Sequence, residues 1–129
     1  MSTIDSLNDD DIREIELELT GICNINCPLC MCNMECASHL VGKPNILPID
    51  KWISILSKYK NTTDVFFAGN LSEPTLYPYL FDLIDYLHGR CIAVELYTNG
   101  MTHCKDWWRE LSLHMKQCDK CEFTICGST

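Results

Sequence analysis

The chain reads IELELTGICNINCPLC over residues 15–30, and this stretch decides the interpretation of the rest. Apolar Ile15, Leu17 and Leu19 alternate with Glu16 and Glu18, which is the period-two pattern of a strand with one buried face. The alternation leads directly into three cysteines with the spacing C-x3-C-x2-C. We therefore expect a strand over residues 12–20 that ends in a cysteine-rich loop.

The three cysteines are Cys23, Cys27 and Cys30, and their spacing suits a compact inorganic cluster. Each thiolate can point inward from a different turn of the loop. A [4Fe–4S] cluster normally takes four cysteine ligands, so three cysteines leave one iron open to another ligand. Two alternatives remain at this point. A zinc site uses four Cys or His ligands, usually as two separated pairs, and a disulfide framework needs an oxidising compartment.

Length and composition limit the class of protein. The 129 residues predict one domain over 12–129 after an acidic lead-in at 1–11. No apolar run has the length of a membrane span, and the acidic start lacks the features of a signal peptide, so we expect a cytoplasmic location without membrane association. The net charge of −8 argues against nucleic acid as a partner. Ten cysteines in a cytoplasmic chain indicate metal or redox chemistry.

Helical and strand patterns alternate along the remainder of the chain. We expect helices that begin near residue 49 and residue 79 and a third over 103–115, with strands over 64–68, 91–97 and 122–126. Such alternation predicts an α/β fold with about four parallel strands and flanking helices. Four strands do not close a barrel and leave an open sheet edge. Either the chain is a fragment, or a partner chain covers that edge, or the fold is a reduced version.

Polar motifs follow the predicted strands at their carboxyl ends, where parallel α/β folds gather ligand groups. Gly69 and the pair Glu73-Pro74 follow the second strand. The tripeptide 98–100, Thr-Asn-Gly, follows the third, and Ser128 follows the fourth. Without further context, the glutamate–proline pair is a loop turn and Asn-Gly is a turn with positive φ.

Taken in order, these motifs resemble the radical S-adenosylmethionine (radical SAM) superfamily. The strand, the C-x3-C-x2-C loop with Leu29 before its last cysteine, the Gly-x-x-x-Glu-Pro segment and the Thr-Asn-Gly segment all correspond. The resemblance implies a partial (βα)6 barrel, of which this chain covers the N-terminal two-thirds, counted in strands. It also implies a [4Fe–4S] cluster whose fourth iron binds SAM, reductive cleavage of SAM to a 5′-deoxyadenosyl radical, and hydrogen abstraction from a substrate.

The resemblance assigns roles to individual residues. Cys23, Cys27 and Cys30 would ligate the cluster, and Glu73 with the Gly69 backbone would hold the amino group of SAM. The sequence departs from the family pattern here, because residues 70–72 are inserted between that glycine and glutamate. The backbone near Leu29 would face the adenine. The rest of the SAM site would be lined by Pro74, Thr98, Asn99 and Ser128.

The substrate is expected to be a small molecule or a peptide, and the electron donor a protein such as flavodoxin or ferredoxin. No residue is predicted as a general base or a nucleophile. Two rival functions remain open: a zinc-stabilised binding module, and a truncated or regulatory radical SAM remnant without independent catalysis.

Further cysteines and histidines lie outside these motifs. Four further cysteines, with His39 nearby, have the ligand types of a second metal site: Cys32, Cys36, Cys118 and Cys121. We favour the interpretation that these cysteines bind no metal. We expect the Trp107–Trp108 pair to serve helix packing. Three other histidines are expected to face solvent: His88, His103 and His114.

Overall fold

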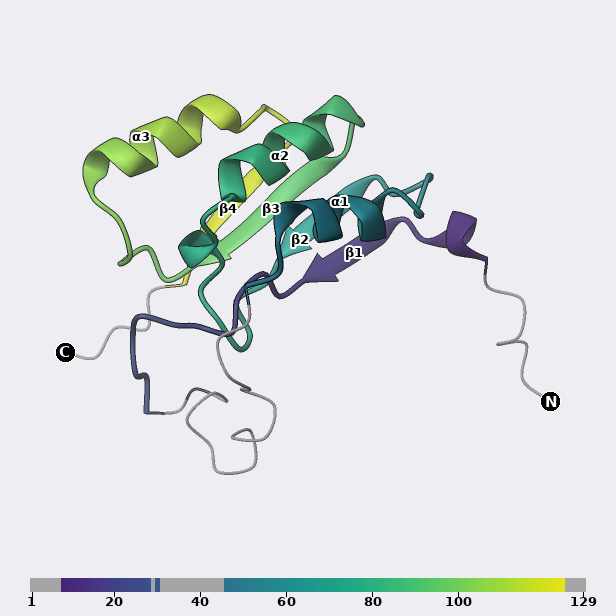
Figure 1. Ribbon diagram of the computed structural model, residues 1–129. Coiled ribbons are helices and arrows are strands. Elements are labelled where there is room, and N and C mark those ends of the chain that lie inside the picture. Colours follow the sequence, from purple (N-terminus) through teal and green to yellow (C-terminus); the bar gives the residue numbers. More distant parts are fainter. Residues whose placement is uncertain (1–7, 29, 31–45, 125–129) are drawn as a thin grey trace.

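The computed structural model describes residues 8–28, 30 and 46–124 (Figure 1). In these residues, four strands form one parallel sheet in the order β1-β2-β3-β4. The strands are β1 (Glu14–Leu17), β2 (Asp64–Phe67), β3 (Ala93–Thr98) and β4 (Lys120–Phe123). The helices between them are α1 (Ile49–Leu56), α2 (Leu80–Gly89) and α3 (Lys105–His114). Two short 3-10 turns complete the list, η2 (Asp9–Asp11) and η5 (Pro74–Leu76).

All three helices lie on the same side of the sheet (Figure 1). Consecutive strands that pair in parallel need a crossover, and crossovers of one hand place their helices on one face. The predicted α/β class with a four-stranded parallel sheet and flanking helices is therefore confirmed.

The strand boundaries differ from the prediction by a few residues. The first strand is shorter than 12–20 because only Glu14–Leu17 pair with β2. The third begins at Ala93 rather than at residue 91, because Cys91 adopts a positive φ of 60° that interrupts an extended backbone. The fourth spans Lys120–Phe123, earlier than the predicted 122–126.

The hydrophobic core fills the space between the sheet and the helices. Strand side chains alternate, so Val65, Phe67, Val94 and Leu96 are buried against the helical layer. The helices contribute the other half of this core, chiefly Leu56, Leu80, Leu83, Ile84, Leu87 and Leu111. Trp107 and Trp108 pack against the same cluster, which confirms their expected role in helix packing.

The opposite face of the sheet is covered by no helix in the described part of the chain. Its side chains are half-buried or exposed, as the alternating burial of β3 shows. Within residues 8–28, 30 and 46–124, β1 and β4 each pair with a single strand, so both sheet edges are open there. The open sheet edge that we predicted, because four strands do not close a barrel, is therefore present in the described residues.

One prediction about the histidines is wrong. His88 was expected to face solvent, but its residue is 8% exposed and its Nε2 lies 2.8 Å from Asp119 Oδ2. His103 and His114 are half-buried rather than solvent-facing. Sequence periodicity placed His88 at the end of α2, but it could not reveal that the loop before β4 folds back over this end.

Among the described helices, none has both the length and the apolar character that a membrane span requires.

Candidate functional site

The cysteine loop is attached to the loop after β2 at the carboxyl end of the sheet. Thr20 ends the extended segment after β1, and its hydroxyl shares its one proton between the carbonyls of Ile22 and Glu73, at 3.2 and 3.3 Å. The Glu73 amide in turn donates to the Ile22 carbonyl at 2.8 Å. These contacts join segments about fifty residues apart and hold the start of the loop against the β2 loop.

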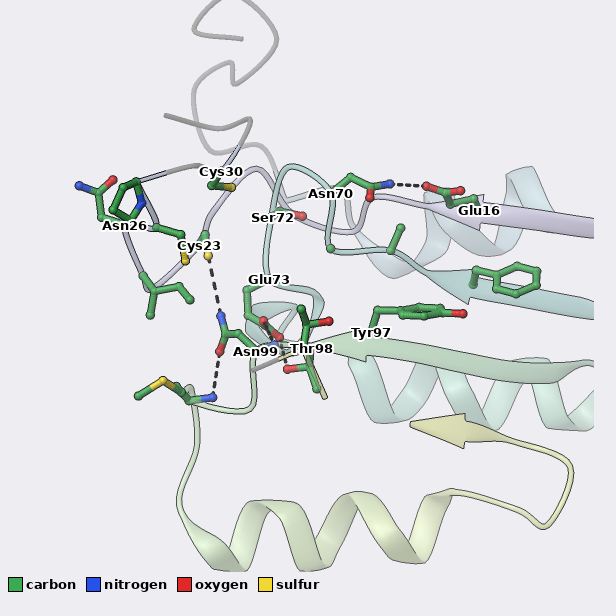
Figure 2. Close-up of a pocket in the computed structure, with 18 residues that line it drawn as sticks. Glu16, Cys23, Asn26, Cys30, Asn70, Ser72, Glu73, Tyr97, Thr98 and Asn99 are labelled. Carbon is green, nitrogen blue, oxygen red and sulfur yellow. Dashed lines mark hydrogen bonds between the residues drawn. The ribbon is translucent and has the colours of Figure 1, made fainter. Parts of the chain in front are cut away.

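All three predicted cluster cysteines line one cavity of about 1010 Å³ (Figure 2). Cys23 is exposed, while Cys27 and Cys30 are half-buried. The Cys30 amide donates to the Cys27 carbonyl at 3.0 Å, so these two cysteines stand at the two ends of a tight turn with Pro28 inside it. The C-x2-C spacing therefore folds locally in the way that presents two thiols to the same space.

Glu73 lies at the inner wall of this cavity and is 2% exposed. Its Oε1 accepts hydrogen bonds from the Thr98 and Thr75 hydroxyls, both at 2.6 Å, and from the Thr75 amide at 3.2 Å. Within the described residues, its Oε2 accepts one hydrogen bond, from the Asn99 amide at 2.8 Å. A carboxylate has about four lone-pair directions, so Oε2 has room for a further donor.

The turn after β3 connects this carboxylate to the cysteine loop. Asn99 Nδ2 lies 3.8 Å from Cys23 Sγ (Figure 2). It also donates to Asn24 Oδ1 at 2.8 Å. Asn24 Nδ2 donates in return to the Met101 carbonyl at 3.3 Å. Gly100 is required here, because its φ is +73° and a Cβ would lie 2.8 Å from the Phe123 ring.

The inserted residues 70–72 form a loop that is held by Glu18. The Glu18 carboxylate accepts hydrogen bonds from the Asn70 and Leu71 amides at 3.0 and 3.2 Å and from the Ser72 hydroxyl at 2.7 Å. Asn70 Nδ2 also donates to Glu16 at 2.7 Å. The departure from the family pattern is therefore an ordered loop rather than a disruption of the site.

The structure brings most of the predicted site residues together. The cavity is lined by the three cysteines and by Gly69, Glu73, Thr98 and Asn99. Pro74 is buried at the start of η5, directly behind Glu73. Two predicted residues, Leu29 and Ser128, lie outside the described residues.

Sequence reasoning missed three residues that organise the site. Thr75 supplies two of the four hydrogen bonds to Glu73, Glu18 holds the inserted loop, and Asn24 links the cysteine loop to the β3 turn. Only Thr75 carried a signal, because its amide lies two positions after Glu73, the N-cap residue of η5 whose side chain accepts from it.

A site for a single metal ion needs several ligand side chains close together. Within residues 8–28, 30 and 46–124, no group of three or more His, Cys, Asp or Glu converges closely enough to hold one metal ion.

The four cysteines considered for a second metal site lie only partly within the described residues. Cys32, Cys36 and His39 lie outside the described residues. Cys118 is exposed and Cys121 is half-buried on β4. Burial, with a smaller effect from the Glu73 charge, raises the pKa of the Cys121 thiol, which disfavours its metal-binding thiolate form in the metal-free protein.

Comparison with known proteins gives a distant relative. No family model matches the sequence. A curated protein that matches is the tungsten-containing aldehyde ferredoxin oxidoreductase cofactor-modifying protein of Pyrococcus furiosus. The two are 25% identical over 104 residues. The match covers 78% of this chain but only 28% of the relative, so the chain spans well under two thirds of the length of the protein that it resembles.

Proposed function

We propose that the chain is the N-terminal portion of a radical SAM enzyme core. One observation carries the proposal: the three cysteines of the C-x3-C-x2-C loop and the buried Glu73 carboxylate line a single cavity at the carboxyl end of a parallel sheet. This is where α/β folds bind their ligands. The three cysteine thiolates would hold a [4Fe–4S] cluster, and SAM would bind beside it.

Glu73 is the residue best suited to the amino group of SAM. Its carboxylate is buried, all of its hydrogen-bond donors are neutral, and Oε2 has one donor within the described residues. A buried carboxylate without a counter-charge favours an ammonium group in the adjoining space. Thr98 and the Asn99 amide fix the orientation of the carboxylate, and Asn99 also reaches toward Cys23.

The chemistry that the cluster and SAM supply when bound is reductive cleavage of SAM and hydrogen abstraction from a substrate, with electrons from a donor such as flavodoxin or ferredoxin. The chain itself positions these groups, shields them from water and leaves the open face of the sheet for substrate. The name of the relative supports a role connected with a metallo-cofactor, because that protein is described as cofactor-modifying. The cytoplasm is the proposed location.

The first test is iron content and electron paramagnetic resonance of anaerobically reconstituted, dithionite-reduced protein, with and without SAM. We expect a [4Fe–4S]⁺ signal that changes when SAM is added. Cys27→Ser should abolish the signal, because a cluster held by three thiolates does not tolerate the loss of one. Cys104→Ser is the matched control, since Cys104 is exposed and does not line the cavity, and it should leave iron content unchanged.

Two results would contradict the proposal in different ways. A cluster signal that is indifferent to SAM would favour a remnant that has lost the cofactor pocket. Colourless protein that contains zinc in place of iron would favour a zinc-stabilised binding module.

A further inference from the structure

The face of the sheet opposite the helices is strongly acidic. Strand alternation places a carboxylate on this face from every strand, including Glu16 on β1, Asp64 on β2, Glu95 on β3 and Glu122 on β4. Along the register these carboxylates alternate with other side chains, because Glu16 is opposite Phe66, Phe66 is opposite Glu95, and Glu95 is opposite Lys120.

One cation on this face offsets only part of the charge. Lys120 Nζ lies 3.5 Å from a Glu95 carboxylate oxygen and 3.0 Å from one of Glu122, and these contacts raise its pKa. In the part of the chain that the structure describes, Glu16 and Asp64 take part in no ion pair. Glu16 accepts a hydrogen bond from the neutral Asn70 side chain, which leaves its charge uncompensated.

The acidic face and the cavity are continuous. Glu16, Phe66 and Tyr97 belong to the open face and also line the cavity that holds the three cysteines (Figure 2). The Tyr97 ring already has a cation of this chain over it, because Lys120 Nζ lies 5.5 Å from its centroid. Phe66, opposite Glu16, is the ring on which a further alkyl stem can pack beside a carboxylate that attracts its cationic head. The Tyr97 hydroxyl donates to Glu95 at 2.8 Å, which fixes one carboxylate next to its ring.

We infer that this face binds a polypeptide segment with several Lys or Arg side chains and guides it into the cavity. The inference rests on the proposed function and names the substrate class of the same site. The charge favours a polypeptide over a small amine, because the carboxylates are distributed across all four strands. A single amine needs one of them, whereas an extended basic segment can face several at once.

The test is a calorimetric titration of the full chain with defined peptides. The probes are a blocked octapeptide that contains three arginines separated by glycine and leucine, its counterpart with three glutamates, and arginine amide. We expect the basic peptide to bind, its affinity to fall steeply between low and high salt, and the acidic peptide not to bind. Arginine amide should bind at least about tenfold more weakly than the basic peptide, because it engages fewer carboxylates.

Matched variants locate the binding. Glu16→Gln combined with Glu95→Gln should weaken the basic peptide about fivefold or more, since each exposed charge contributes modestly. The glutamines keep hydrogen-bonding oxygens for Asn70 and Tyr97. The control is Glu110→Gln combined with Asp82→Asn, which removes the same charge from the exposed surfaces of α3 and α2. That control should retain the wild-type affinity.

Several outcomes would overturn the inference. Equal binding of the acidic peptide, or equal weakening by both double variants, would show that the face does not recognise cations. Binding of arginine amide as tightly as the peptide would assign the site to a small amine. Self-association lost in the Glu16/Glu95 double variant would assign the face to a second copy of this chain.

The result is separable from that of the proposed function. Peptide binding is measured on protein without iron or SAM, so a failed reconstitution leaves the titration interpretable. If the cluster and SAM bind but the basic peptide does not, the substrate class is wrong and the enzyme class stands.

Discussion

Two carboxylates are buried at opposite ends of the same sheet. Glu73, at the carboxyl end, is 2% exposed and accepts four hydrogen bonds from hydroxyls and amides. The Asp119 side chain, in the loop that leads into β4 at the amino end, is 0% exposed. It accepts from the Val94 amide at 2.9 Å and the Lys116 amide at 2.6 Å, and it lies 2.8 Å from His88 Nε2.

The two carboxylates differ in their hydrogen-bond partners, and this difference distinguishes a residue that stabilises the fold from a candidate binding residue. Both Asp119 oxygens are occupied by groups of the protein, one of them a histidine, and Asp119 does not line the cavity. In the described residues, Glu73 has no cationic partner and its Oε2 accepts one hydrogen bond. Glu73 also borders the cavity that the three cysteines line. A buried charge without a counter-charge is costly, and for this reason the proposed function places the ammonium group of SAM beside Glu73.

The largest expected effect is that of Asp119→Ala. The change leaves two backbone amides and His88 without their acceptor, so we expect a loss of about 3 kcal/mol in the free energy of unfolding. Urea denaturation followed by circular dichroism measures it. Asp106→Ala is the control, because its pair with Arg109 is exposed and should cost less than about 0.5 kcal/mol. Similar losses in both variants would contradict a structural role specific to Asp119.

A smaller effect is expected for Glu73→Gln, which should also change ligand binding. Converting one oxygen to an amide group places a donor against donors from Thr98 or Asn99, and we expect a loss of about 2 kcal/mol. In contrast to Asp119→Ala, it should also remove the SAM-dependent change in the cluster signal. The same two measurements on both variants test the comparison. A variant with normal stability and a normal response to SAM would show that Glu73 is neither a scaffold nor a ligand.

The smallest expected effect is a loss of stability at alkaline pH, and it involves Tyr77 at the carboxyl end of the sheet. Burial, followed by the charges of Tyr79 and Asp50, raises the pKa of Tyr77 from 10.0 to about 12. Because the folded state holds this proton more tightly, its contribution is complete below pH 10 and is lost as pH rises toward about 12. Tyr77 is buried and its hydroxyl donates to the Leu47 carbonyl at 2.9 Å, and we expect a loss of about 1 kcal/mol.

Stability curves between pH 9 and pH 12 for the wild type and Tyr77→Phe test this last expectation. The phenylalanine variant has no proton to lose, so its stability should fall less over the same interval. Parallel curves for the two proteins would show that Tyr77 does not contribute to the pH dependence.

Much of the fold could be predicted because the responsible forces are local. Alternating apolar residues predicted the strand around Leu17, and spacings of three and four predicted the helix that ends at Leu56. The predicted strand boundaries were less accurate where the backbone conformation of one residue set them, as the positive φ of Cys91 does before β3. The burial of His88 could not be predicted, because it depends on contacts with a loop thirty-one residues away.

The sequence by itself determined the parallel α/β class and the gathering of cysteines and polar motifs at one sheet edge, because residue periodicity and strand direction dictate these features. Only the tertiary structure decided that Glu73 is buried among neutral donors at the wall of a cavity, that Glu18 organises the inserted loop, and that one face of the sheet is acidic and uncovered in the described residues. Those properties depend on contacts between residues far apart in the chain, and no local pattern records them.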